Sequence, residues 1–287
     1  MHAWLCETPT GVDQLIWKEL PTPTPGPGEV LVQIQAASLN FPDLLIVQNK
    51  YQFKPSLPFV PGSEWAGVVQ SLGEGVSHLQ VGQAVACLSG TGGFATHTVA
   101  KADQCVPLPP NFPAVDAAAF IMIYATSHHA LVDRAQLRAG ETVLIHGGSS
   151  GIGITAIHLA KWVGAIVITT VGNEEKMRIC TSLGADHVIN YKTQDFQTVV
   201  KEITHGQGVN MVLDMVAGPY VEKNLRSLAL EGRLVQIAFL QGSKVEADWS
   251  TLMMRRLTFT GSTLRARPLE EKSRLVQTLH ARIWPEL

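Results

Sequence analysis

The sequence predicts an α/β protein in which a β-rich first domain precedes a doubly wound parallel sheet. Its 287 residues are enough for about two domains of about 150 residues each. Before residue 121, short apolar runs are separated by Gly, Ser and Pro. After it, compact β-branched runs alternate with stretches rich in Ala and Leu. Strands that alternate with helices predict right-handed crossovers in a parallel sheet.

Composition excludes several classes of protein. With 46% hydrophobic and 16% charged residues, the chain is not disordered. A net charge of -2 offers no cationic surplus for nucleic acid. The four cysteines are scattered singly, which predicts neither a disulfide framework nor a structural zinc site. Without a signal peptide or an apolar run near the about 20 residues of a bilayer crossing, we expect a cytoplasmic protein with no membrane partner.

The first domain is predicted over residues 1–121. Residues 29–36 alternate apolar and polar side chains, as a strand with one buried face does, and they follow a Pro- and Gly-rich turn at 21–28. Further strands are expected at 64–72, 84–88 and 94–100. Short strands at this spacing are typical of a small twisted barrel.

The second domain is predicted over residues 122–259, after a helical stretch that begins at residue 116. A final piece, 260–287, contains a helix at 269–284 that is opened by Pro268 and Glu270. Strands of the second domain are expected at 142–146, 165–171, 187–190, 211–215 and 233–238.

The strongest local signal is a buried strand that runs into a glycine-rich turn, His146-Gly-Gly-Ser-Ser-Gly-Ile-Gly153, followed by a helix from about Ile154. This is the context of the Rossmann dinucleotide fingerprint. Gly148 is expected to allow the tight turn, and Gly153 to let the helix pack closely. Ser150 replaces the usual middle glycine, where the backbone passes the pyrophosphate at the helix N-terminus.

The next strand predicts which dinucleotide binds. It ends at Gly172-Asn173 without the Asp or Glu that would hold the ribose of NAD, and Lys176 follows one turn later. An uncharged tip with a nearby cation suits the 2′-phosphate of NADP(H), which is the cofactor we expect. The alternative is that Lys176 is simply a solvated helix residue.

Many motifs along nearly the whole chain resemble one family. They are Leu39-Asn-Phe-Pro-Asp43, Pro61-Gly-Ser-Glu-Trp-Ala-Gly-Val-Val69, Gly92-Gly-Phe-Ala95, Leu183-Gly-Ala-Asp-His-Val-Ile-Asn-Tyr191, Gly232-Arg-Leu-Val235 and Gly261-Ser-Thr-Leu-Arg265. In this order they resemble the medium-chain dehydrogenase/reductase superfamily, and within it the zinc-free, zeta-crystallin-like NADPH:quinone reductases. The resemblance implies a GroES-like first domain that takes the substrate.

The resemblance also bears on metals. Where the alcohol dehydrogenase branch carries a Cys and a Gly-His-Glu as zinc ligands, this chain has Asn40 and Gly62-Ser63-Glu64, so no metal is expected. His128 and His129 are adjacent, and neighbours on a helix point about 100° apart, which argues against a shared ion. His146 is expected to be a hydrogen-bonded core residue.

By resemblance, the candidate catalytic residues are Asn40 and Asp43, near the nicotinamide, and Tyr51, as an acid or quinone contact. Tyr51 equally suits a structural role, with its ring packed and its hydroxyl exposed. Asp43 also suits a helix cap, for a helix beginning at Leu44. Leu45 stands where several relatives carry a tyrosine.

The cofactor contacts implied by the resemblance fall into three groups. One borders the nicotinamide, one is the glycine turn, and one holds the adenosine phosphate. They are Tyr124, Thr126, Ile237, Phe239, Ser262, Thr263 and Leu264; Gly148, Ser149, Ser150, Gly151, Ile152 and Gly153; and Gly172, Asn173, Lys176 and Tyr191.

Family members continue about 40 residues past the equivalent of Leu287, with elements that return to the first domain. If residue 287 is a natural end, we expect the barrel of the first domain to expose apolar surface that is normally covered, with dimer pairing or partial misfolding as the result. If the chain is a fragment, the function below is that of the intact protein. A homodimer is expected from the family, and the run 234–240 suits an interface strand or a buried central strand.

The resemblance implies an NADPH-dependent, zinc-independent oxidoreductase that transfers hydride to small-molecule quinones or α,β-unsaturated carbonyls. A close alternative is an enoyl- or acryloyl-thioester reductase of the same fold, for which Arg265 and Arg267 offer a basic cluster. An alternative of another class is a non-catalytic NADPH-binding sensor or structural protein.

Overall fold

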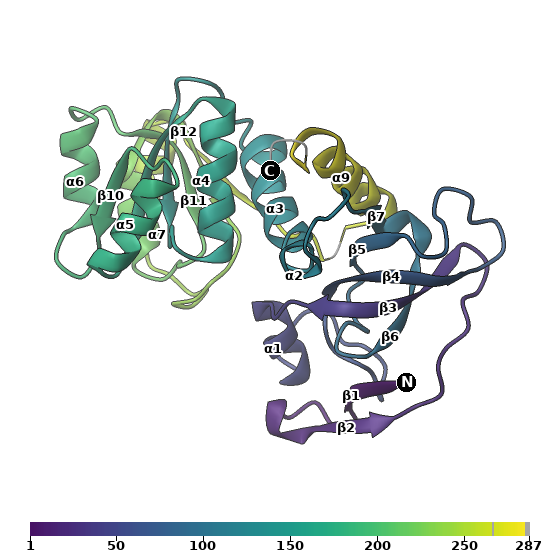
Figure 1. Ribbon diagram of the computed structural model, residues 1–287. Helices are drawn as coiled ribbons and strands as arrows, with labels where there is room; N and C mark the ends of the chain where they lie inside the picture. The colour runs from purple at the N-terminus through teal and green to yellow at the C-terminus, as the bar shows by residue number, and fades with distance from the viewer. Residues whose placement is uncertain (266, 285–287) are drawn as a thin grey trace. The chain divides into compact units, whose positions relative to one another are not determined.

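The computed structural model describes residues 1–265 and 267–284. Two units can be distinguished: unit 1 comprises Met1–Ala125 with the segment from Arg265 onward, and unit 2 comprises Thr126–Leu264 (Figure 1). Each unit has its own sheet, and helix α3 (Ile121–His128) runs from one unit into the other. No helix in the described ranges is both long and apolar enough to span a membrane.

Unit 1 is built on an antiparallel sheet of five strands in the order β6-β3-β4-β5-β7. Its alternating pattern is confirmed at β3, where Val30 and Val32 are fully buried and pack with Trp65 of β4. A separate ribbon pairs β1 with β2. The strands are β1 (His2–Cys6), β2 (Leu15–Glu19), β3 (Glu29–Ala37), β4 (Glu64–Leu72), β5 (Ala84–Leu88), β6 (His97–Lys101) and β7 (Cys105–Pro107).

Unit 1 also contains helices, of which α2 contacts β3 and β4, and α9 contacts β7. They are α1 (Phe41–Val47), α2 (Ala114–Ala117) and α9 (Leu269–Arg282), with 3₁₀ turns at Val12–Gln14 and Ala102–Gln104. The helical stretch expected from residue 116 is broken: α2 ends before α3 begins at Ile121, and a π-helix follows at His129–Arg134. The apolar composition of this stretch did not reveal either change.

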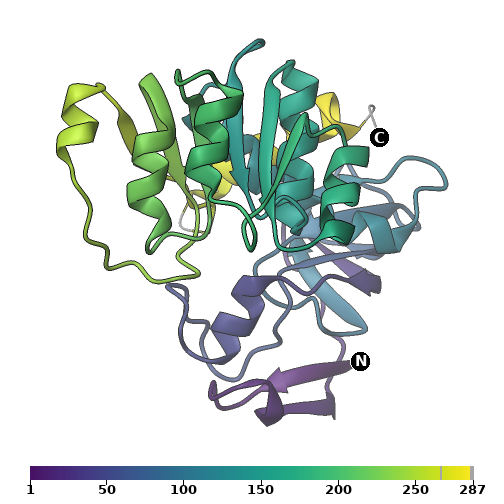
Figure 2. The same cartoon turned by 90° about the vertical axis from the view of Figure 1, so that its left-hand side faces the viewer.

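Unit 2 contains a parallel sheet of six strands in the order β10-β9-β8-β11-β12-β13 (Figure 2). The chain order reverses between β8 and β11, and ligands of such sheets bind at the carboxyl ends of the strands at that point. The strands are β8 (Thr142–His146), β9 (Ile166–Val171), β10 (His187–Asn190), β11 (Val209–Asp214), β12 (Leu228–Gln236) and β13 (Thr258–Gly261).

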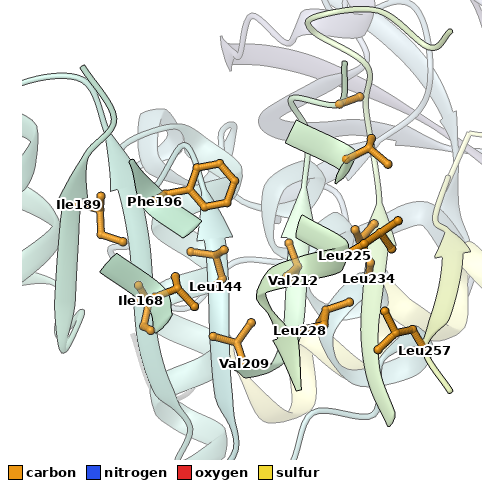
Figure 3. Packing of buried hydrophobic residues seen from close by; sticks show 13 residues of the cluster. Leu144, Ile168, Ile189, Phe196, Val209, Val212, Leu225, Leu228, Leu234 and Leu257 are labelled. Carbon is orange, nitrogen blue, oxygen red and sulfur yellow. The ribbon is translucent and has the colours of Figure 1, made fainter. Parts of the chain in front are cut away.

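The helices of unit 2 pack against this sheet and form its core with it. Phe196 of α6 and Leu225 of α7 lie over Leu144 and Val212 of the central strands, as Figure 3 shows, and all four are buried. The helices are α4 (Gly151–Val163), α5 (Glu174–Ser182), α6 (Phe196–Ile203), α7 (Tyr220–Ser227) and α8 (Ser250–Met254).

Candidate functional site

The glycine turn joins β8 to α4, but the structural roles of its glycines differ from the predicted ones. The left-handed conformation falls on Gly147, with φ of 70°, and not on Gly148. A Cβ on Gly148 would lie 2.1 Å from Oγ1 of Thr169 on β9, so this glycine makes room for the next strand. A Cβ on Gly153 would lie 2.2 Å from the carbonyl oxygen of Gly147, which confirms the close packing expected at Gly153.

Ser150 caps the helix. Its Oγ accepts a hydrogen bond from the Gly153 N–H at 3.0 Å and donates to the Gly147 carbonyl at 2.7 Å. The helix therefore begins at Gly151, three residues earlier than predicted. An α-helix leaves its first N–H groups without intrahelical partners, and Ser150 uses only one of them. The remaining groups, with the positive end of the helix dipole, favour an anionic ligand.

The tip of β9 carries the residues expected at an adenosine phosphate. The chain turns at Gly172, and the Asn173 side chain caps α5 by accepting from the Lys176 N–H at 2.9 Å. Glu174 and Glu175 lie in the first turn of α5, so no acidic side chain stands at the tip itself. Tyr191 lies beside Gly172, where a Cβ would come within 2.7 Å of the tyrosine hydroxyl. The structure thus brings Gly172, Asn173, Lys176 and Tyr191 to one place.

The segments of unit 2 that were expected to border the nicotinamide follow the last two strands of its sheet. The Ile237 N–H donates to the Asp214 carbonyl at 2.9 Å, and the Ser262 N–H donates to the Gln236 carbonyl at 3.0 Å. Because β8, β12 and β13 are parallel, Ile237, Phe239 and 262–264 lie at the same edge of the sheet as the glycine turn. Thr126 is half-buried on α3.

A buried polar network that the sequence analysis did not foresee supports this edge. His146 Nε2 is bonded to Asn224 Oδ1 at 2.7 Å, and Asn224 Nδ2 donates to the Asp214 carboxylate at 3.0 Å. This assigns the proton to Nε2 of a neutral His146, whose pKa is lowered by burial. Nδ1 then accepts from Thr170 Oγ1 at 3.1 Å. The expectation of a hydrogen-bonded core histidine is confirmed.

In unit 1, Asn40 and Asp43 lie together at the start of α1. The Asp43 carboxylate accepts from the Asn40 N–H at 3.0 Å and from the Ser63 hydroxyl. Helix α1 begins at Phe41 and not at Leu44, so Asp43 lies in its first turn. Burial raises the pKa of Asp43, although these hydrogen bonds and the charge of Arg265 oppose the shift.

Asn40 is held by the carboxylate of Glu64, a role that was not predicted from the sequence. Asn40 Nδ2 donates to Ser38 Oγ at 2.9 Å and to Glu64 Oε2 at 3.1 Å. Glu64 also accepts from Ser38 Oγ at 2.7 Å and from the Met122 N–H at 2.8 Å. Burial raises the pKa of Glu64 to about 7, despite these hydrogen bonds. The motif Gly62-Ser63-Glu64 thus orients Asn40 and Asp43 together.

The two candidate tyrosines of unit 1 are both buried in part. Tyr124 stacks on Phe120 with ring centroids 4.3 Å apart, and burial raises its pKa to about 12. Tyr51 packs against a small cluster that includes Ile46 and Phe59, and burial raises its pKa as well. The Arg265 guanidinium lies 5.9 Å from the centroid of the Tyr51 ring.

An apolar groove of about 870 Å³ adjoins Asn40 and Asp43 within unit 1. Its walls include exposed large side chains: Trp4, Trp17 and Phe41 are 44%, 49% and 54% exposed. A groove with this lining favours a flat, apolar compound over a highly charged one.

The adjacent histidines both lie near Asp133, His128 as the last residue of α3 and His129 as the first of the π-helix. Asp133 lies 3.0 Å from His129 Nδ1 and 3.9 Å from His128 Nδ1. These distances do not bear on the prediction, which concerned a metal ion shared by the two histidines. Across residues 1–265 and 267–284, no three His, Cys, Asp or Glu side chains gather as metal ligands would.

The run 234–240 divides at the end of β12. Leu234 and Val235 are fully buried, and β12 pairs with both β11 and β13, so this part is an interior strand. Phe239 and Leu240 follow it and are 56% and 57% exposed.

Comparison with known proteins identifies the chain's relatives. A family model for the alcohol dehydrogenase GroES-like domain matches residues 26–110, and one described as zinc-binding dehydrogenase matches 151–281. Rattus norvegicus quinone oxidoreductase is 31% identical over 266 residues, which are 92% of this chain and 80% of the rat protein. A phenolphthiocerol/phthiocerol polyketide synthase subunit of Mycobacterium tuberculosis is 34% identical over 231 residues, 80% of this chain, but this is 10% of the synthase's own length.

Solved structures agree with these matches. Escherichia coli quinone oxidoreductase, complexed with NADPH, superposes with a TM-score of 0.85 at 29% identity, over 99% of this chain and 87% of that one. The CurK enoyl reductase gives a TM-score of 0.88 at 26% identity, over 99% of this chain and 88% of that one. The chain therefore belongs to the medium-chain dehydrogenase/reductase superfamily and, within it, to the zinc-free quinone oxidoreductase branch.

Proposed function

We propose that the chain is an NADPH-dependent, zinc-independent oxidoreductase that reduces quinones or α,β-unsaturated carbonyl compounds. The observation that carries the proposal is the carboxyl edge of the unit 2 sheet. There the glycine turn follows β8 and leads into α4. The neighbouring strand β9 ends without an acidic side chain at its tip. The relatives named quinone oxidoreductase support the reaction class.

The residues of unit 2 fit a dinucleotide phosphate. Gly153 and Gly172 leave space that a Cβ would fill against the turn and against Tyr191. The N-terminus of α4 would hold the pyrophosphate, and Lys176 with Tyr191 would hold the adenosine 2′-phosphate. When bound, NADPH supplies a hydride from its nicotinamide ring.

The residues of unit 1 would hold the acceptor and control its proton. The side-chain amide of Asn40 donates to both Ser38 and Glu64, which fixes its orientation. Tyr51 keeps its hydroxyl proton at neutral pH, because the ordinary pKa of a tyrosine is 10.0 and burial raises it further. An acid must be protonated before it donates. The apolar groove beside Asn40 and Asp43 suits the apolar part of a planar acceptor.

Titration of the purified chain with NADPH and NADH, followed by nicotinamide fluorescence, tests the cofactor. Oxidation of NADPH by 9,10-phenanthrenequinone and by crotonyl-CoA tests the acceptor. We expect NADPH to bind more tightly than NADH, and the quinone to be reduced. A folded chain that binds neither nucleotide would overturn the proposal.

The enoyl-thioester alternative is favoured by the fold match to the CurK enoyl reductase. The basic cluster invoked for it does not form, however. Arg265 faces Phe53 and the Gly90 carbonyl, whereas Arg267 lies 3.6 Å from Glu271. Faster turnover of crotonyl-CoA than of the quinone would establish this alternative.

A non-catalytic role as a nucleotide sensor or structural protein is the remaining alternative. It predicts tight NADPH binding with no oxidation by either acceptor. We also propose that the chain forms a homodimer, as expected from the family, and sedimentation velocity would test this. A single species of monomer mass over the micromolar range would overturn the dimer.

A further inference from the structure

The Arg265 side chain lies in unit 1 near Asp43 and Tyr51. Its guanidinium carbon is 4.5 Å from the centroid of the Phe53 ring and 5.9 Å from that of Tyr51. Its Nη2 donates to the Gly90 carbonyl at 2.8 Å. Gly90, with φ of 97°, lacks the Cβ that would lie 3.0 Å from Nη1. The site is therefore shaped around the guanidinium.

The positive charge of Arg265 is not neutralised by an ion pair in the part of the chain that the structure describes. Its Nε is buried and has no acceptor there. Asp43 affects it only through space, since the Asp43 carboxylate is bonded to Asn40 and Ser63. Lys272 adds a second cation, because its Nζ donates to the Arg265 carbonyl at 2.9 Å.

Arg265 is half-buried, and a cation partly removed from water without an ion-pair partner is costly unless a ligand or reaction uses it. Desolvation lowers the pKa of both Arg265 and Lys272, which is the electrostatic sign of that cost. Two aromatic rings beside the guanidinium provide flat surfaces for a conjugated compound. The neighbouring Tyr51 hydroxyl is a proton donor of raised pKa.

We propose that Arg265, Tyr51 and Phe53 form the acceptor subsite, in which Arg265 stabilises the negative charge that develops on the acceptor's carbonyl oxygen. The inference rests on the proposed function and adds the residues that would recognise its acceptor. The chemical class of ligand is a planar, conjugated carbonyl compound whose oxygen is anionic or becomes so during reduction.

The electrons and protons balance as follows. As the acceptor gains a hydride at carbon, the electron pair of its conjugated π system moves onto oxygen and forms an enolate or hydroquinone anion. That oxygen takes the proton of Tyr51, so the phenolic O–H bond breaks and a new O–H bond forms. The Tyr51 phenolate, stabilised by the adjacent Arg265 charge, regains a proton from solvent.

Binding of a stable anion tests the subsite without cofactor. The probe is 2-hydroxy-1,4-naphthoquinone, which is a delocalised anion at neutral pH, and neutral 1,4-naphthoquinone is its partner. Calorimetric titration should show that Arg265→Met weakens binding of the anion about tenfold or more, and of the neutral quinone about threefold or less. Arg265→Lys should give an intermediate loss, because it keeps the charge but not the planar fork.

Arg256→Met is the matched control, since Arg256 is an exposed arginine of unit 2 paired with Glu231. It should leave both affinities unchanged. The thermal unfolding midpoint of each variant shows whether it is folded. If Arg265→Met does not fold, the anion affinity of Arg265→Lys is compared with that of the wild type instead. Equal anion affinity in wild type and both Arg265 variants would overturn the inference.

Kinetics separates the inference from the proposed function. With NADPH and 9,10-phenanthrenequinone, Arg265→Met and Tyr51→Phe should each lower kcat about tenfold or more, with the affinity for NADPH unchanged. If wild type reduces no quinone but binds the anion through Arg265, the proposed function fails and the subsite stands. If the wild type reduces the quinone and the Arg265 variants have the same kcat, the subsite inference is wrong and the proposed function stands.

Discussion

The amide of Asn40 is bonded to the carboxylate of Glu64, with 3.1 Å between Nδ2 and Oε2. Two residues that lie 24 positions apart are thus joined inside unit 1. Glu64 also accepts a hydrogen bond from the Met122 N–H at the start of α3. One fully buried carboxylate therefore connects β4, α3 and the residue before α1. Glu64 therefore helps to fix the position of Asn40.

Glu64 should make the stability of the chain depend on pH. Its pKa is about 7 in the folded protein against 4.5 ordinarily, so the folded state binds the proton more tightly than the unfolded state. Stability is therefore lost as pH rises from about 4.5 to about 7, by up to about 3 kcal/mol. In urea unfolding at pH 5, 6 and 8, wild type should lose this amount relative to Glu64→Gln. A difference that stays constant with pH would contradict the assignment.

Gly153→Ala should damage the glycine turn. The added Cβ would meet the backbone oxygen of Gly147, which cannot move aside as a flexible side chain could. We expect a loss of about 2 kcal/mol or more in the free energy of unfolding, with loss of NADPH binding. Gly261→Ala is the control, because the nearest atom to its Cβ would be 3.8 Å away. Its stability should remain within about 0.5 kcal/mol of wild type; equal effects of the two substitutions would refute the steric argument.

Lys176→Ala should weaken NADPH binding about tenfold, or about 1.4 kcal/mol, and leave NADH binding unchanged. The reason is that only NADPH carries the 2′-phosphate, and no acidic side chain stands at the β9 tip to compete for Lys176. Fluorescence titration of both nucleotides provides the measurement. Lys201→Ala, on α6, is the matched removal of a lysine charge. A similar loss of affinity for NADH would show that Lys176 does not recognise the 2′-phosphate.

Asn224→Ala should destabilise unit 2 by about 2–4 kcal/mol, because it leaves His146 and Asp214 without a shared partner in a buried site. Chemical denaturation measures the loss, and substitution of the exposed Gln207 by Ala serves as the control. Asn224→Asp should also destabilise, since a second carboxylate would face Asp214. A neutral result for Asn224→Ala would mean that water replaces the amide.

Local signals were enough to predict the parallel sheet and its glycine turn. The run 142–146 and the residues that follow it are contiguous, so strand, turn and helix could be expected from one short segment. By contrast, β2 was not predicted, because four of its five residues are exposed and it shows no alternation of buried and exposed positions. The π-helix depends on one extra residue per turn, for which composition gives no signal.

The parts of the candidate site that were missed depend on contacts between distant positions. Asn224 meets His146 across 78 positions, and Arg265 meets Gly90 across 175. Neither pairing follows from periodicity. Glu64 was visible in its motif, but that motif was compared only with the zinc ligands of the alcohol dehydrogenase branch, and the role of Glu64 toward Asn40 follows only from the geometry.

Gly172 and Tyr191 limit each other's evolution. The hydroxyl of Tyr191 occupies the space that any larger residue at position 172 would need, since a Cβ there would lie 2.7 Å from it. Among homologues, the two positions should therefore vary together: where the tyrosine is replaced by a shorter side chain, alanine or serine becomes tolerable at 172. An attempt to redesign this end of the protein for another nucleotide would have to change both residues in one step, because the intermediate with a side chain at 172 and Tyr191 intact carries the clash.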